Sequence, residues 1–220
     1  APKTTAQHLA LDLLRKEPTV LWLGLIVALT QVVSILFELT FLGVLQTAIP
    51  VTDPRSAFLV RFWNVQDLVA LALTFVVTPF LLSRLSLARV HFLIPAVHIC
   101  TALVVFFHPN LWTATAAFFM FKTLDYDLFG AAKEVLYIPL SFASRYRAKQ
   151  LIDGVIYRTS KGVTSGMISA ATAAAGTLKA TLVYPPACCV ALLGWIFFVA
   201  RLTRSLPKPS EPGEGTHRSM

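Results

Sequence analysis

Charged residues are scarce in this chain of 220 residues: Asp, Glu, Lys and Arg make up only 14%, whereas hydrophobic residues make up 56%. Soluble domains carry about 25% charged residues. Apolar runs of roughly 18 residues or more recur along the chain, and about 20 such residues cross the ~30 Å hydrocarbon core of a bilayer. The composition excludes an ordinary soluble domain and predicts an all-α, polytopic membrane protein.

The residue patterns of enzymes and metal proteins are also missing. Three cysteines (Cys100, Cys188 and Cys189) lie in apolar stretches, without the spacing of a zinc site, and an odd number argues against a disulfide framework. No nucleophile is paired with a base, and no glycine-rich loop of the Walker type is present. We therefore expect no enzymatic activity, no cofactor and no metal.

The sequence has no secretory signal, because residues 1–17 are polar and no short apolar core with a cleavage site follows them. The net charge of +8 does not indicate a nucleic-acid partner here. In a polytopic membrane protein, an excess of Lys and Arg marks the cytoplasmic loops. We expect a multi-pass protein of a bacterial inner membrane, surrounded by membrane lipids.

The apolar runs predict six transmembrane helices, at about 19–49, 66–82, 91–107, 111–138, 162–178 and 181–202. A cytoplasmic amphipathic segment (1–18) precedes them, an amphipathic connector (140–161) is expected to lie in the inner interface, and a disordered polar tail (203–220) follows. Lys and Arg gather in residues 1–18, the 83–91 turn, the connector and the tail; the alternate loops hold only Arg55, Arg61 and Lys179. This bias places both termini in the cytoplasm.

The fourth predicted span carries most of the charge inside the apolar runs, and its charged residues are Lys122, Asp125, Asp127, Lys133 and Glu134. A charge in a membrane segment is costly unless it faces a protein interior or water. At 100° per residue, Lys122, Asp125 and Lys133 share one sector, with Asp127 and Glu134 beside it. This face predicts either a cavity wall or structural ion pairs between helices, with interfacial snorkelling as the alternative for Lys133 and Glu134.

The first predicted span repeats this pattern with Gln31, Ser34 and Glu38 on one helical stripe. Glu38 has no partner within its own helix, so it could pair with Lys122, become protonated or face water. We favour a water-filled cavity shared by the two spans. In the fifth span small residues recur every fourth position, from Gly162 and Gly166 onward, which is typical of close helix packing.

Around these residues the sequence resembles the ATP/ADP antiporter family, the nucleotide transporters of plastids and intracellular bacteria. The resemblance rests on Ala131-Ala132-Lys133-Glu134, then Tyr137-Ile138-Pro139-Leu140, then Lys149, Ile152-Asp153, Arg158 and Lys161-Gly162. Glu38-Leu39-Thr40 is similar to the family's seventh transmembrane helix. The resemblance implies a major-facilitator-like architecture in which this chain is the carboxy-terminal six-helix half, built from two inverted three-helix repeats.

Two positions differ from the family pattern. Leu42 stands where the family tends to carry a basic residue after the glutamate, and Gly130 stands where it tends to carry an arginine before the Ala-Ala-Lys-Glu run. Binding of a polyphosphate depends on several fixed cations.

The predicted function is therefore transport of an anionic solute, with a nucleotide as the candidate, by alternating access as half of a twelve-helix carrier. The candidate substrate-binding residues are Glu38, Lys122, Asp125, Asp127, Lys133, Glu134 and Lys161. An amino-terminal half, a second copy or another membrane subunit would complete the bundle. The alternative is a non-transporting subunit or scaffold, derived from such a carrier, that docks other proteins or lipids.

Overall fold

The computed structural model describes residues 13–175 and 180–205, and every element in these ranges is helical. The elements are α2 (Pro18–Ala48), α3 (Thr52–Ala72), η1 (Leu73–Val77), α4 (Thr78–Arg84), α5 (Leu87–Phe107), α6 (Leu111–Thr123), η2 (Leu124–Phe129), α7 (Gly130–Leu136), α8 (Phe142–Lys149), η3 (Gln150–Ile156), α9 (Tyr157–Ala175) and α10 (Ala180–Ser205). The predictions for residues 1–12 and for the tail from 206 to 220 lie outside the described residues.

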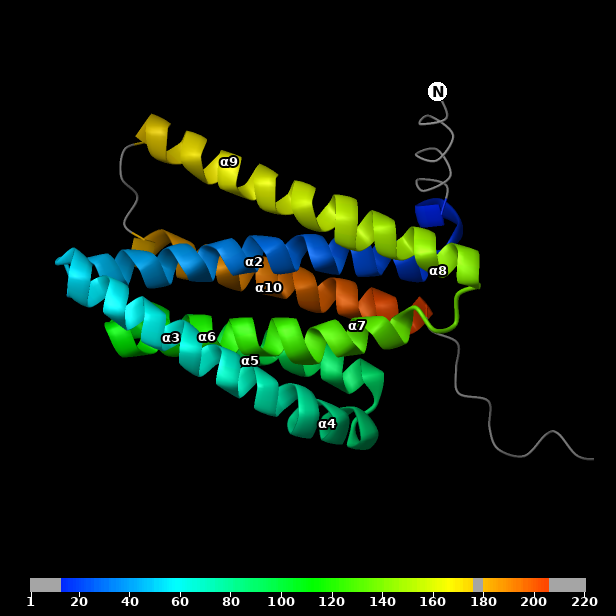
Figure 1. Ribbon diagram of the computed structural model, residues 1–220. Coiled ribbons are helices and arrows are strands. Elements are labelled where there is room, and N and C mark those ends of the chain that lie inside the picture. The colour runs from blue at the N-terminus through cyan, green and yellow to red at the C-terminus, as the bar shows by residue number, and fades with distance from the viewer. Residues whose placement is uncertain (1–12, 176–179, 206–220) are drawn as a thin grey trace, which may run out of the picture.

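The elements join into long helical rods that run back and forth along one direction (Figure 1). Residues 52–84, 111–136 and 142–175 are each helical without a break, and each contains one π-helical segment, respectively η1, η2 and η3. A π-helical segment has i→i+5 hydrogen bonds and a wider turn than the α-helix around it. The beginning of α2 and the end of α10 lie at the same end of the bundle (Figure 1).

Four of the described helices are long and apolar enough to cross a membrane: Pro18–Ala48, Thr52–Arg84, Leu87–Phe107 and Thr181–Ser205. They correspond to the first, second, third and sixth predicted spans. The fourth and fifth spans are helical in the structure, but the charges in 111–136 and the small polar residues of α9 keep their hydropathy low. Six membrane crossings and the inverted repeats therefore stay predictions.

The second helix corrects one expectation from the sequence. It begins at Thr52, so residues 51–61, which were expected to be a link, are almost entirely helical. Pro54 does not prevent this, because the amide groups of a first helical turn have no partner within the helix. Asp53 in that turn also interacts favourably with the helix dipole.

Helix α2 is the centre of the bundle. Of its most apolar 18-residue window 67% is buried, against 11% for the helix Thr52–Arg84. It packs against α10, α6, α9 and η3, and Figure 1 shows it running beside α10 with α9 on its other side. A side chain on a face of α2 that meets these neighbouring helices is therefore enclosed by protein rather than by lipid.

Aromatic rings join α2, α3 and α6. Phe62 of α3 stacks on Phe41 of α2 and on Phe118 of α6, with ring centroids 5.0 Å and 5.6 Å apart. Phe41 and Phe118 also stack, at 5.1 Å. Stacked aromatic pairs contribute beyond their buried area. This cluster anchors α3, which is otherwise largely exposed.

The small-residue face of α9 is not a packing contact in the described part of the chain. A Cβ added to Gly162 or Gly166 would meet no atom within 4 Å. The side of α9 that is half-buried instead carries Ser160, Thr164, Ile168 and Thr172, and α9 packs on α2. Close approach occurs at Gly24 of α2, where an added Cβ would lie 2.8 Å from Ile156 Cδ1.

Truncation of the aromatic cluster tests this packing. We expect Phe62→Ala to lower the free energy of unfolding by about 2–3 kcal/mol, below the range of water-soluble cores because lipid supplies no hydrophobic driving force between helices. Phe75→Ala, in the same rod but 74% exposed, is the control and should change it by less than about 0.5 kcal/mol. Thermal unfolding in detergent measures both, and equal losses would contradict the packing described.

Candidate functional site

Lys122, in the last turn of α6, is enclosed by the bundle. The residue is 6% exposed, and its ammonium donates a hydrogen bond to the Ser34 hydroxyl of α2 at 3.5 Å. The same nitrogen lies 5.2 Å from the Phe118 ring centroid and 5.3 Å from that of Tyr126. Cation–π contacts stabilise a desolvated ammonium. Lys122 therefore faces the first predicted span, as its helical sector predicts.

Two carboxylates surround this lysine without touching it. The charges of Glu38 on α2 and Asp125 on η2 both act on the Lys122 ammonium. Yet no carboxylate oxygen lies within 4.0 Å of its Nζ among the described residues. Lys122 and Asp125, three residues apart along the chain, thus form no direct ion pair. Oδ1 of Asp125 is buried and accepts no hydrogen bond from the described residues.

Two tyrosines extend this group toward α9. Tyr126 follows Asp125 on η2 and is 56% exposed, and its hydroxyl interacts with that of Tyr157 at the start of α9. Lys161 lies one turn further along α9, where its side chain is exposed and its charge acts on Tyr157. We call Ser34, Glu38, Lys122, Asp125 and Tyr126 the central polar group.

Asp127 belongs to a different contact. Its Oδ1 accepts a hydrogen bond of 2.7 Å from the Thr74 hydroxyl on η1, while its Oδ2 is buried without a partner among the described residues. The bond joins two π-helical segments that pack against each other. Asp127 therefore turns away from the central polar group.

Lys133 and Glu134 are held in ion pairs. Lys133 Nζ lies 2.5 Å from Asp153 Oδ1 of η3, and Glu134 pairs with Lys149 of α8. The structure thus separates the seven candidate residues. It groups Glu38, Lys122 and Asp125. Asp127 lies against η1, and Lys161 lies on the surface of α9. Lys133 and Glu134 form ion pairs with residues of η3 and α8.

The π-helical segment η2 explains this separation. A uniform helix puts Lys133 in the sector of Lys122 and Asp125, but a residue added to one turn rotates everything after it by about 100°. Residues 124–129 form such a wide turn. The charged face of the predicted helix is therefore divided at Asp127.

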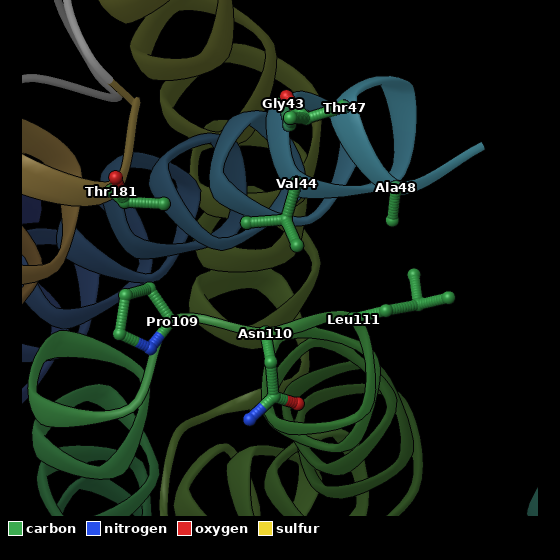
Figure 2. Close-up of a pocket in the computed structure, with 8 residues that line it drawn as sticks. All are labelled: Gly43, Val44, Thr47, Ala48, Pro109, Asn110, Leu111 and Thr181. Carbon is green, nitrogen blue, oxygen red and sulfur yellow. The ribbon is translucent and has the colours of Figure 1, made fainter. Parts of the chain in front are cut away.

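A cavity lies elsewhere in the described part of the chain. It has a volume of about 630 Å³ and is lined by Gly43, Val44, Thr47, Ala48, Pro109, Asn110, Leu111 and Thr181. Figure 2 shows Val44 and Ala48 of α2 facing the turn of Pro109, Asn110 and Leu111. None of the candidate residues lines it, and it contains no charged group, so it does not fit an anionic ligand. The described residues also hold no group of three His, Cys, Asp or Glu that could bind a metal.

Comparison with known proteins identifies the carboxy-terminal part of the chain. Residues 110–206, which include α6, η2, α7, α8, η3, α9 and α10, match the family model described as TLC ATP/ADP transporter. The resemblance to the ATP/ADP antiporter family is confirmed. Among curated proteins and solved structures, no significant match was found. The matched segment contains Lys122, Asp125, Asp127, Lys133, Glu134 and Lys161, whereas Glu38 lies outside it.

Some polar residues that the structure brings into contact were not candidates in the sequence. Thr74 has no charge and lies in an apolar run, and only a hydroxyl in the middle of a span could have drawn attention to it. Asp153 and Lys149 belong to the motifs of the resemblance, but their partners follow from tertiary contacts. Tyr126 shares the sector of Lys122, and its contact shows only in three dimensions.

The contact between η1 and η2 can be tested with Thr74→Val, which keeps the shape of the side chain and removes the donor to Asp127. We expect a loss of about 1.5–3 kcal/mol in unfolding free energy, because a hydrogen bond to a charged group is lost. Thr47→Val is the matched control, since the Thr47 hydroxyl bonds only to the carbonyl of Gly43 in its own helix. Chemical unfolding in detergent measures the stability of both variants. An equal loss of unfolding free energy in the two would contradict the contact.

Proposed function

We propose that this chain is one half of a membrane carrier for an anionic solute, with a nucleotide as the solute that the family match favours. The match with the ATP/ADP transporter family supports a nucleotide transporter kind of function. In this proposal the helices of 111–138 and 162–178 also cross the membrane, and both termini lie in the cytoplasm. A further set of helices, from another half or a second copy, closes the solute path.

One observation carries the proposal: within residues 13–175 and 180–205, no carboxylate is in contact with the buried Lys122 ammonium. A charged side chain within a membrane segment is expensive and marks ion or substrate pathways. A lysine that served only to lock two helices would form a close ion pair, as Lys133 does with Asp153. Lys122 instead has a weak hydroxyl contact and two aromatic faces, so its charge remains free for an anionic ligand.

The neighbours of Lys122 suit reversible binding. Glu38 and Asp125 are near enough to act on the ammonium, yet neither of them forms a salt bridge with it. When a solute leaves, these carboxylates can stabilise the lysine again, which lowers the cost of the empty state. The exposed ring of Tyr126 and the exposed ammonium of Lys161 lie on the side of the group that is open to a partner half.

The competing function is a membrane subunit that does not transport. Leu42, one turn beyond Glu38, is exposed and apolar, where the family tends to carry a cation. At Gly130 an added Cβ would meet only the Asp125 carbonyl at 3.9 Å, so the position has room for a side chain that this chain lacks. If the protein binds no nucleotide, these two positions favour the structural role.

Ligand binding separates the two functions. We expect ATP or ADP at a concentration of about one hundred times its Kd to stabilise the purified protein by about 2.7 kcal/mol, because a ligand that binds only the folded state shifts the unfolding equilibrium. The measurement is a thermal melt in detergent with a panel of nucleotides, and inorganic phosphate serves as the anion control. A melt unmoved by every nucleotide would support the non-transporting subunit.

A transport assay tests the role of Lys122 in binding the solute. We expect Lys122→Ala to reduce nucleotide uptake by reconstituted vesicles at least tenfold, because the enclosed cation for the solute is lost. Lys16→Ala removes an equal charge from an exposed position and should leave uptake unchanged. Uptake by the Lys122 variant at the level of the control, with equal amounts of folded protein, would remove this lysine from the site.

A further inference from the structure

Four charged residues form two neighbouring ion pairs at the end of the bundle where α2 begins and α10 ends. Lys133 and Glu134 are consecutive in α7, and they pair with Asp153 and Lys149, which lie one helical turn apart after the turn of the chain. Each positive group therefore faces a negative one across the two helices. The Lys133–Asp153 pair is the more enclosed, with side chains 17% and 40% exposed, against 38% and 50% for Lys149 and Glu134.

The segment that carries three of these charges is bounded by two π-helical segments. We call residues 130–149 the hairpin tip; it consists of α7, a turn and α8, with η2 before it and η3 after it. The turn inside the tip is rigid, because Arg145 donates hydrogen bonds to the carbonyls of Tyr137 (3.0 Å) and Ile138 (2.6 Å). The Lys149 ammonium also lies 5.6 Å from the Tyr137 ring centroid.

The two ion pairs have different positions relative to these boundaries. Glu134 and Lys149 both belong to the tip, so their pair stiffens it internally. Asp153 lies in η3, outside the tip, so its pair with Lys133 ties the tip to the next segment. Only the second pair must break when the tip moves relative to η3.

The turn of the tip is loosely seated on the rest of the bundle. A cavity of about 280 Å³ separates this turn from the beginning of α2 and the end of α10, and it is lined by Glu17, Thr19, Leu136, Pro139, Leu140, Ser141, Ser144 and Ser205. Helix α8 continues directly into η3 within one rod. Wide turns at both boundaries and a polar cavity underneath give the tip room to move as one unit.

We propose that the Lys133–Asp153 pair is a latch that holds the hairpin tip closed, and that the tip opens by bending at η2 and η3. The latch deepens the proposed transport function, on which its purpose rests. Lys122 lies on the same rod about 16 Å from Lys133, so an open tip would expose the central polar group from this end of the bundle. An ion pair with one partner still 40% exposed, as Asp153 is, adds little net stability, which makes such a contact easy to break and form again.

The latch is tested by the accessibility of residues that the closed tip keeps buried. Ala132 and Ile152 are fully buried, and Ala132→Cys or Ile152→Cys would place a thiol there, in a protein whose three native cysteines are replaced by alanine. The readout is the labelling rate with a membrane-impermeant maleimide in open phospholipid vesicles. We expect Asp153→Asn to raise this labelling rate about tenfold. The double variant with Lys133→Asp and Asp153→Lys exchanges the two charges and should label at the rate of the parent.

Two controls make the result specific. Lys149→Gln breaks the pair inside the tip and should change labelling less than twofold. Ala102→Cys, a fully buried position in α5 away from the tip, should stay protected in every variant. If Asp153→Asn raised labelling at position 102 as much as at positions 132 and 152, the whole bundle would have loosened, and the latch would be overturned. An Asp153→Asn variant that labels no faster than its parent would also overturn it.

A cysteine variant that fails to fold leaves the test intact, because hydrogen exchange of the backbone amides in 130–156 measures the same opening without any introduced thiol. Faster exchange confined to this segment in Asp153→Asn is the expected result, and unchanged exchange contradicts the latch. Neither measurement uses a nucleotide. A protein that opens but transports nothing would therefore overturn the proposed function alone, and transport with no change in opening would overturn the latch alone.

Discussion

The structure depends on how a single ammonium is accommodated inside an apolar bundle. Lys122 requires a hydroxyl, two aromatic rings and the field of two carboxylates, and α2 and the rod 111–136 supply all of them. This requirement fixes which sides of the two helices face each other. It also explains why α2, the most enclosed helix, carries Gln31, Ser34 and Glu38 on one stripe instead of aliphatic residues.

The π-helical segments form the second constraint. Each of them lies in a rod that carries a polar contact, and the contacts involve the segments themselves: Thr74 of η1 with Asp127 of η2, and Asp153 of η3 with Lys133. Such wide turns are common at functional sites because they re-aim side chains within an otherwise regular helix. Here they allow the charges of one rod to make different contacts. Lys122 contacts a hydroxyl and two aromatic rings, whereas Lys133 and Glu134 form ion pairs.

The sequence predicted the helical content and the direction of Lys122, because the 3.6-residue period of the helix determines which residues share a face. It could not predict that Asp127 turns toward Thr74, since a wide turn leaves no periodic signal. It also placed a loop at residues 51–61, where proline in a first helical turn is in fact tolerated. The stripe of Gly162 and Gly166 was expected to pack closely, yet within the described residues that face of α9 is open.

Composition alone determined that this is a helical membrane protein, because an apolar chain with few charges can satisfy its backbone in lipid only by forming hydrogen bonds within itself. The sequence also determined which few side chains are costly in that setting, since a charged side chain within a membrane segment raises the free energy unless protein or water surrounds it. Only the tertiary structure decided which of these charges form ion pairs among the described residues. Pairing depends on distances between rods that no local pattern encodes: Lys133 lies 2.5 Å from a carboxylate oxygen, whereas the ammonium of Lys122 contacts a hydroxyl at 3.5 Å.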